Sequence, residues 1–172
     1  MALASRRPDL VAGLIIEDAP LWLRRFTVKA GSDRAYTFFK SLHQLCLETQ
    51  DEAALRQRIP TELPQVAARE AGDLASRLAR LDPDVLQMSF DSSLMNGFDI
   101  DVALAEIVCP ALVFQADVAQ GGSLGDEDAQ AALRLLQRGT GRTMAGSGHA
   151  IHRDRPAEMA TLILDWLKEN KL

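Results

Sequence analysis

The sequence predicts an α/β fold in which a helical insertion interrupts a partial parallel sheet. Two short segments, at residues 10–18 and 111–117, are apolar on both faces, as strands are when helices cover both sides of their sheet. Helical periodicity separates and follows these segments. Strands that alternate with helices form parallel sheets, so the order strand, helical insertion, strand, helix, strand, helix indicates this class.

The N-terminal segment contributes the end of a helix, at residues 1–7, and the first strand. This strand reads LVAGLIIED at residues 10–18 and is closed by Ala19 and Pro20. Because only two further strands are predicted, we expect the edge of the first strand to lie bare. A bare hydrophobic edge favours pairing with another chain.

The middle of the chain has a helical pattern. Proline cannot continue a helix through its interior, so Pro60, Pro64 and Pro83 are expected to separate successive helices. The predicted organisation is a core segment, a helical insertion and a second core segment, at residues 1–34, 35–98 and 99–172.

The C-terminal segment begins with the second strand, ALVFQAD, which leads into the glycine-rich loop QGGSLGDED. A helix is predicted over residues 126–137 and a shorter strand over residues 141–145. An amphipathic closing helix is predicted after Pro156. The loop GSGHAIH connects the last strand to this closing helix.

Composition narrows the classes of function. The chain has 172 residues, 47% of them hydrophobic, with a net charge of −5 and scattered basic residues, which argues against nucleic acid as a partner. No apolar run approaches the roughly 20 residues that span a bilayer, so we expect a cytoplasmic protein with no membrane partner. Cys46 and Cys109 match neither a zinc site nor a disulfide framework, and we expect both to be reduced and buried.

Three segments resemble the α/β-hydrolase family from just after its nucleophile elbow to its C-terminus. They read RPDLVAGLIIEDAP, CPALVFQAD and GSGHAIHRDRPAEM, in that order along the whole chain. The resemblance implies the last three strands of the hydrolase sheet, with the helical insertion as the cap or lid that selects the substrate. It also implies hydrolysis of an ester, lactone, epoxide or carbon–carbon bond of a small molecule by a nucleophile, a histidine and an acid.

The resemblance identifies His149 as the catalytic histidine. Gly146 and Gly148 let the backbone turn so that the imidazole can project from the loop, and histidine titrates near neutrality, as a catalytic base requires. The alternative is a loop histidine without a role. His152 is expected to line the pocket or to be a polar residue of a first helical turn. A metal site of these two histidines lacks a third ligand, so no metal is predicted, and His43 is expected to be structural.

The acid of the triad is left open by the sequence. The family pattern after the second strand is Gly-Asp-x-Asp, with the second aspartate acting, whereas this chain has alanine at that position. Asp117 and Asp18 rank equally as the acid, and Asp126 and Asp128 are further candidates. For Asp117 and Asp18 the alternative is a carboxylate that caps a turn or a helix.

Substrate-binding residues are predicted mainly among large side chains of the insertion and its borders. The alternative is that the aromatic rings only pack the cap. The predicted set, which also includes His152, is Trp22, Phe26, Phe38, Phe39 and Met95.

We expect the nucleophile and the oxyanion hole to be absent from this chain. No Gly-x-Ser-x-Gly elbow is recognised, and the sequence around Ser147 lacks the spacing. The chain alone should then be inactive, and its partner would be a missing N-terminal half or a second copy joined through the first strand. No phosphate-binding glycine loop precedes a helix, so no cofactor is predicted. The competing function is a non-catalytic binding or assembly module that uses the same fold.

Overall fold

The computed structural model describes residues 1–22, 34–64, 66, 68–89 and 96–172. The chain is divided into two compact units. The first comprises Met1–Trp22 and Phe98–Leu172, and the second comprises Leu23–Gly97. The sequence places the first boundary at residue 34, where the helical pattern begins, whereas the first unit ends at Trp22.

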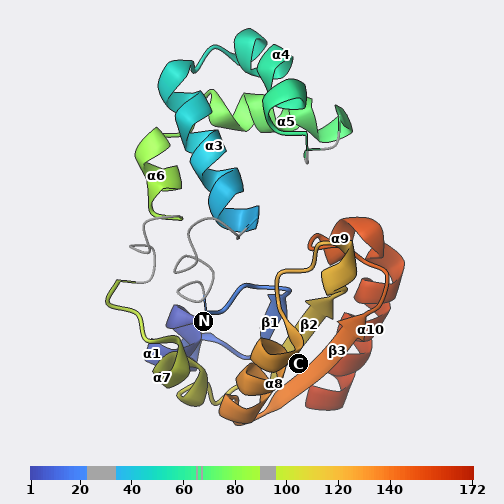
Figure 1. Ribbon diagram of the computed structural model, residues 1–172. Helices are drawn as coiled ribbons and strands as arrows, with labels where there is room; N and C mark the ends of the chain where they lie inside the picture. The colour runs from blue at the N-terminus through green and yellow to red at the C-terminus, as the bar shows by residue number, and fades with distance from the viewer. Residues whose placement is uncertain (23–33, 65, 67, 90–95) are drawn as a thin grey trace. The chain divides into compact units, whose positions relative to one another are not determined.

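The first unit is built on a three-stranded parallel sheet in the order β1-β2-β3, which confirms the predicted fold class (Figure 1). The strands are Leu14–Glu17, Ala111–Ala116 and Gly139–Met144. Leu14 lies opposite Ala111, which in turn lies opposite Gly139. The central strand β2 is buried at five of its six residues, as expected for a parallel strand with helices on both sides.

Alternate residues of β2 face two different helices. Leu112 and Phe114 belong to an apolar cluster with Trp166, a residue of α10 (Pro156–Asn170). Val113 and Gln115 lie instead beside residues of α8 (Asp126–Leu135). Successive side chains of a strand point to opposite faces, so α8 and α10 cover opposite faces of the sheet.

Short helices complete the first unit. Asp99 caps α7, accepting hydrogen bonds from two backbone N–H groups of its first turn, and α7 contacts α1 and α8. Asp117 caps the single turn η3 after β2. The bounds of these elements are α1 Ala2–Arg6, η1 Pro8–Leu10, α7 Ile100–Ala105, η3 Val118–Gln120 and α9 Ile151–Asp154.

The second unit is helical and has its own core. It contains α3 (Arg34–Glu48), α4 (Glu52–Glu62), α5 (Ala68–Leu78) and α6 (Pro83–Gln87). The prediction that a helix ends at Pro60 is wrong, because α4 continues through that residue to Glu62. Pro60 lies in the last turn, where its missing N–H costs a single hydrogen bond. The core residues are Leu42, Leu45, Cys46, Leu55, Ile59, Leu63, Ala71, Ala75, Leu78 and Leu86.

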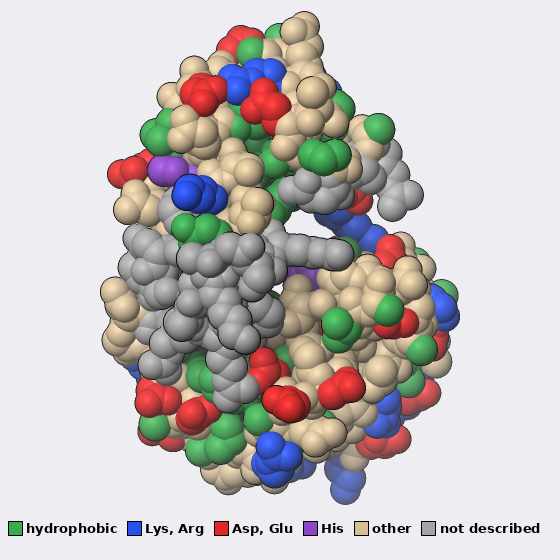
Figure 2. Space-filling model, in the orientation of Figure 1, with side chains coloured by type: hydrophobic (Ala, Val, Ile, Leu, Met, Phe, Trp, Pro, Cys, Tyr) green, Lys and Arg blue, Asp and Glu red, His purple; other side chains and the backbone are tan. Residues whose placement is uncertain are grey.

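Two further expectations concern the surface and the cysteines. On the face drawn in Figure 2, basic and acidic side chains are intermingled rather than segregated. Cys46 and Cys109 are both free and buried, as predicted. Among the helices of the described residues, none combines the length and apolar character needed to cross a membrane.

Candidate active site

Asp18 directly follows β1 and has an unusual backbone conformation. Its φ of 39° lies in the left-handed region, which aspartate tolerates better than most residues with a side chain. Its backbone N–H donates to the carbonyl of Phe114, 2.8 Å away, so the chain stays attached to β2 as it turns. The turn carries the Asp18 side chain into the protein, where it is fully buried.

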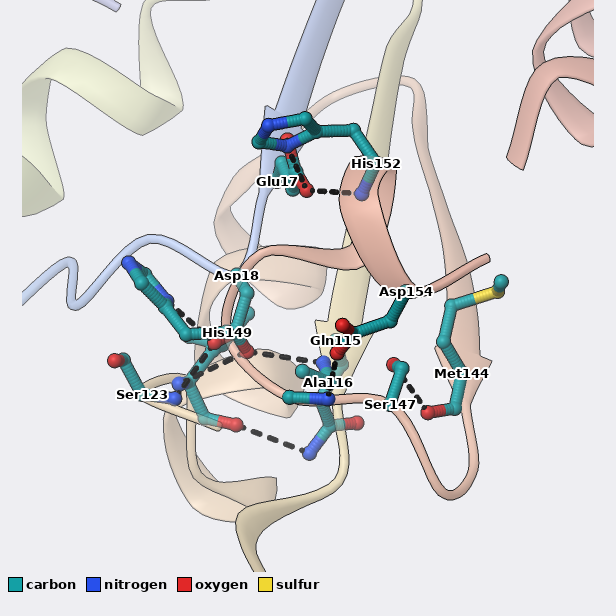
Figure 3. Close-up of polar contacts among 12 residues, drawn as sticks. Glu17, Asp18, Gln115, Ala116, Ser123, Met144, Ser147, His149, His152 and Asp154 are labelled. Carbon is teal, nitrogen blue, oxygen red and sulfur yellow. Dashed lines mark hydrogen bonds and ion pairs between the residues drawn. The ribbon is translucent and has the colours of Figure 1, made fainter. Parts of the chain in front are cut away.

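The Asp18 carboxylate accepts hydrogen bonds from four groups (Figure 3). Oδ1 accepts from the backbone N–H of Ala116 at 2.9 Å and of Leu124 at 3.2 Å. Oδ2 accepts from the backbone N–H of Ser123 at 2.6 Å and lies 2.8 Å from Nδ1 of His149. The carboxylate therefore joins the end of β2, the loop before α8 and the imidazole.

These contacts fix the protonation of the pair. Burial alone raises the pKa of Asp18, but the hydrogen bonds from His149 and from the three backbone N–H groups outweigh burial, so the pKa lies below its ordinary value. Asp18 is thus ionised at neutral pH, and an ionised carboxylate only accepts hydrogen bonds. Nδ1 of His149 must therefore carry the hydrogen, which leaves the lone pair on Nε2.

The loop that carries His149 connects β3 to α9 and is fixed by two carboxylates. Gly146 has a φ of 73°, which favours glycine, and its N–H donates to Oδ2 of Asp117 at 3.0 Å. The N–H of Gly148 donates to Oδ2 of Asp154 at 2.7 Å. Two residues on the N-terminal side of His149 are therefore held by charged acceptors.

Asp117, ranked equally with Asp18 from the sequence, has a different place. Its N–H donates to the carbonyl of Ser147, and its side chain accepts from Ala119 and Gly146. Within the described residues, no hydrogen bond joins Asp117 to His149. The structure thus places Asp18 in contact with the imidazole, whereas Asp117 binds the backbone of the loop that carries His149.

The imidazole of His149 is held on one side and open on the other. Its side chain is 56% exposed, although its partner carboxylate is fully buried. In Figure 3, the ring nitrogen that does not face Asp18 points away from both Asp18 and Ser123. The hydrogen bond to Asp18 raises the pKa of His149, partial burial opposes this effect, and the charge of Glu17 adds to it.

A pH dependence of stability follows from these two shifts. Because its pKa is raised in the folded chain, His149 makes its full contribution to the free energy of unfolding below its ordinary pKa of about 6.5. This contribution is lost as pH rises through the pKa of the folded chain. Because its pKa is lowered in the folded chain, Asp18 contributes to the free energy of unfolding above about pH 3.9. This contribution is lost as pH falls through the pKa of the folded chain. We expect NMR titration to show a raised pKa for His149 that falls in Asp18→Asn. An unchanged pKa in that variant would contradict the pairing.

The other predicted residues lie at several places. His152, at the start of α9, contacts Glu17 through Nδ1 at 2.9 Å. Trp22 is buried, and its indole N–H donates to Oδ1 of Asp101 at 2.8 Å. Phe38 and Phe39 are partly buried against the core of the second unit.

Four remaining candidates are not at the imidazole or cannot be placed. Phe26 and Met95 lie outside the described residues. Asp126 accepts a hydrogen bond from the side chain of Gln115 at 2.6 Å, and Asp128 is a buried residue of the first turn of α8. In the described ranges, no cluster of three metal-ligating side chains occurs.

Two residues of this region were missed from the sequence. The sequence pattern places Glu17 only in the first strand, although its position beside Asp18 at the end of that strand is a signal. Ser123 stands in the letters Gly-Gly-Ser-Leu-Gly at residues 121–125, so the expectation that no Gly-x-Ser-x-Gly occurs is wrong. The serine is nevertheless not on a strand-to-helix turn, because η3 separates it from β2. Its N–H shares Oδ2 of Asp18 with Nδ1 of His149, which places it away from Nε2.

Comparisons with known proteins bear on the fold. No protein-family model matches the chain, and no curated protein matches it by sequence. The solved structures that match include N-formylmaleamic acid deformylase of Pseudomonas putida S16, with 17% identity, a TM-score of 0.65 and 94% of this chain covered. They also include a hydrolase of Oleispira antarctica, with 16% identity, a TM-score of 0.63 and 96% covered.

A third match is an α/β-hydrolase enzyme from a Medee basin deep-sea metagenome, with 12% identity, a TM-score of 0.61 and 97% of this chain covered. The chain spans only 59% to 60% of the length of these three solved chains. At such low identity the similarity concerns the fold. The chain therefore has the C-terminal part of the α/β-hydrolase fold.

Proposed function

We propose that this chain supplies the histidine and the acid of a nucleophile–histidine–acid triad. The reaction would be hydrolysis of an ester, lactone, epoxide or carbon–carbon bond. The observation that carries the proposal is the 2.8 Å contact between Nδ1 of His149 and Oδ2 of the fully buried Asp18. A buried, ionised carboxylate behind a half-exposed imidazole is the arrangement that general base catalysis requires.

Each residue has a defined task in this mechanism. Nε2 of His149 takes the proton of the nucleophile as the nucleophile attacks, and then returns it to the leaving group. Asp18 holds the ring in the Nδ1–H tautomer and stabilises the imidazolium that forms. The three backbone N–H groups that bind Asp18 keep the carboxylate ionised and oriented throughout the cycle.

The nucleophile in this proposal is not contributed by the same copy of the chain. The backbone N–H of Ser123 lies on the Nδ1 side of the ring, so we do not assign Ser123 as the group that gives its proton to Nε2. Among the described residues, β1 pairs only with β2, and Ile15 on it is 39% exposed. We propose that further strands pair with the free edge of β1 and place a nucleophile opposite Nε2. These strands would belong to additional polypeptide or to a second copy of the chain.

The helical second unit is proposed to act as the cap. It is inserted between β1 and β2 and contains its own apolar core. Cap elements of this kind exclude water and control access to the catalytic groups. In this role, the residues of the cap determine which small molecule is the substrate.

Ester hydrolysis by the purified chain tests the source of the nucleophile. We expect no burst with p-nitrophenyl esters of varied acyl length, and steady release equal to that of His149→Ala, because a triad without its nucleophile retains only residual catalysis. His43→Ala is the matched control, and light scattering on the same samples reports whether the chain is a monomer or a dimer. Turnover by a monomer that His149→Ala abolishes and His43→Ala preserves would show a complete site in one chain and refute the external nucleophile, whereas the same result from a dimer would assign the nucleophile to the second copy.

A further inference from the structure

We propose that Glu17 and His152 form a second carboxylate–imidazole pair that positions the loop carrying His149. The pair positions His149, and its importance for catalysis rests on the proposed function. Its effect on the structure of His149 is independent of that function, because it can be measured in the chain without any substrate.

The geometry of the second pair is well defined. Oε1 of Glu17 accepts the backbone N–H of His152 at 2.8 Å and lies 2.9 Å from its Nδ1. Oε2 lies 3.0 Å from the same Nδ1. The Glu17 side chain is 26% exposed and that of His152 58%, so the pair lies at the surface, whereas the Asp18 carboxylate is fully buried. Figure 3 shows the two pairs on separate sides of the loop.

Glu17, the last residue of β1, and Asp18, which follows it, thus hold two points of one short segment. Asp18 binds the ring of His149, and Glu17 binds the backbone three residues later, at the start of α9. Because Asp154 belongs to α9, its bond to Gly148 attaches the loop to α9 and not to the sheet. The hydrogen bonds of Glu17 attach α9 itself to β1.

Apolar packing complements these bonds but cannot replace them. Ile151 is fully buried in the cluster that contains Phe114 and Trp166, which fixes the depth of α9. Apolar contact is non-directional, so it leaves the rotation of a four-residue helix poorly defined. The directional bonds to Glu17 define that rotation and therefore the direction from which His149 meets Asp18.

The charge of Glu17 provides independent support. In the described part of the chain, Asp18 and Glu17 are the charged groups that act on His149, and both raise its pKa. A residue that positions the loop and also stabilises the imidazolium should affect both the tautomer and the titration of His149. A residue with a merely structural role would change neither in a soluble, folded variant.

NMR of the imidazole nitrogens tests the proposal, because the chain has only three histidines. In Glu17→Gln the amide oxygen can still accept the N–H of His152, so we expect the Nδ1–H tautomer of His149 to persist while its pKa falls. In Glu17→Ala we expect a mixture of tautomers and a lower pKa. Loss of a hydrogen bond to a charged group should also make exchange of the His152 amide about tenfold faster.

The outcomes separate this proposal from the proposed function. Glu106→Gln, at an exposed position after α7, is the matched control, and the NMR signals of His43 report whether the second unit is intact. If Glu17→Ala leaves the tautomer of His149 and the exchange of the His152 amide as in the control, the positioning role is wrong. An absence of hydrolase activity in any assembly would refute the proposed function and leave this result unaffected.

Discussion

Replacing Asp18 with alanine is expected to lower the free energy of unfolding by about 3–5 kcal/mol. The carboxylate is fully buried and accepts three backbone N–H groups besides the imidazole. Truncation leaves these donors without their acceptor, and each buried unsatisfied group costs about 1–3 kcal/mol. Alanine also tolerates the φ of 39° less well than aspartate, which adds to the loss.

Urea denaturation followed by circular dichroism measures this effect. Asp165→Ala is the matched control, because Asp165 is exposed on α10 and only meets Lys168 at 3.4 Å, so its loss should change stability by less than about 0.5 kcal/mol. Asp18→Asn should lie between the two variants, since it keeps one carbonyl acceptor. The expected loss of unfolding free energy is about 3–5 kcal/mol. A loss of less than about 1 kcal/mol in Asp18→Ala would show that the three N–H groups find other partners.

The second large effect is expected for Gly122→Val, with a loss of about 2–4 kcal/mol. A Cβ at this position would lie 3.0 Å from backbone atoms of Ala116 and Asp117, which cannot move aside as a flexible side chain can. The loop must then shift and withdraw the backbone N–H groups of Ser123 and Leu124 from Asp18. We therefore expect a lower unfolding free energy.

Gly125→Ala is the internal comparison for this variant. A Cβ at Gly125 meets no atom within 4 Å, and its φ of −68° suits any residue. Denaturation midpoints and the His149 titration should therefore be close to those of the parent chain. Equal effects of the two glycine variants would mean that the loop has room to relax, contrary to the contacts described.

Much of the sheet could be predicted from the sequence because its signals are local. The apolar runs at residues 10–18 and 111–117 each contain a strand, and the glycine-flanked His149 lies after the last strand as expected. The boundaries were less accurate. The third strand begins at Gly139, two residues before its predicted start, because its side chains alternate between exposed and half-buried and give a weak apolar signal.

The identity of the acid could not be predicted because it depends on contacts between distant segments. His149 and Asp18 are 131 positions apart, and no local pattern distinguishes Asp18 from Asp117 as its partner. The structure separates them through the positive φ of Asp18, which turns that carboxylate inward. Glu17 was missed for the same reason, since its partner His152 is 135 positions away.

The insertion of a self-contained helical unit between β1 and β2 has an evolutionary consequence. Both strands belong to the first unit, and their pairing closes a loop whose entropy cost grows only by about 0.6 kcal/mol for each doubling of its length. A lineage can therefore exchange or lengthen the inserted unit with little penalty to the scaffold. With the cap role proposed above, selectivity for new compounds can diversify by such exchanges while the imidazole and its carboxylate keep their contact.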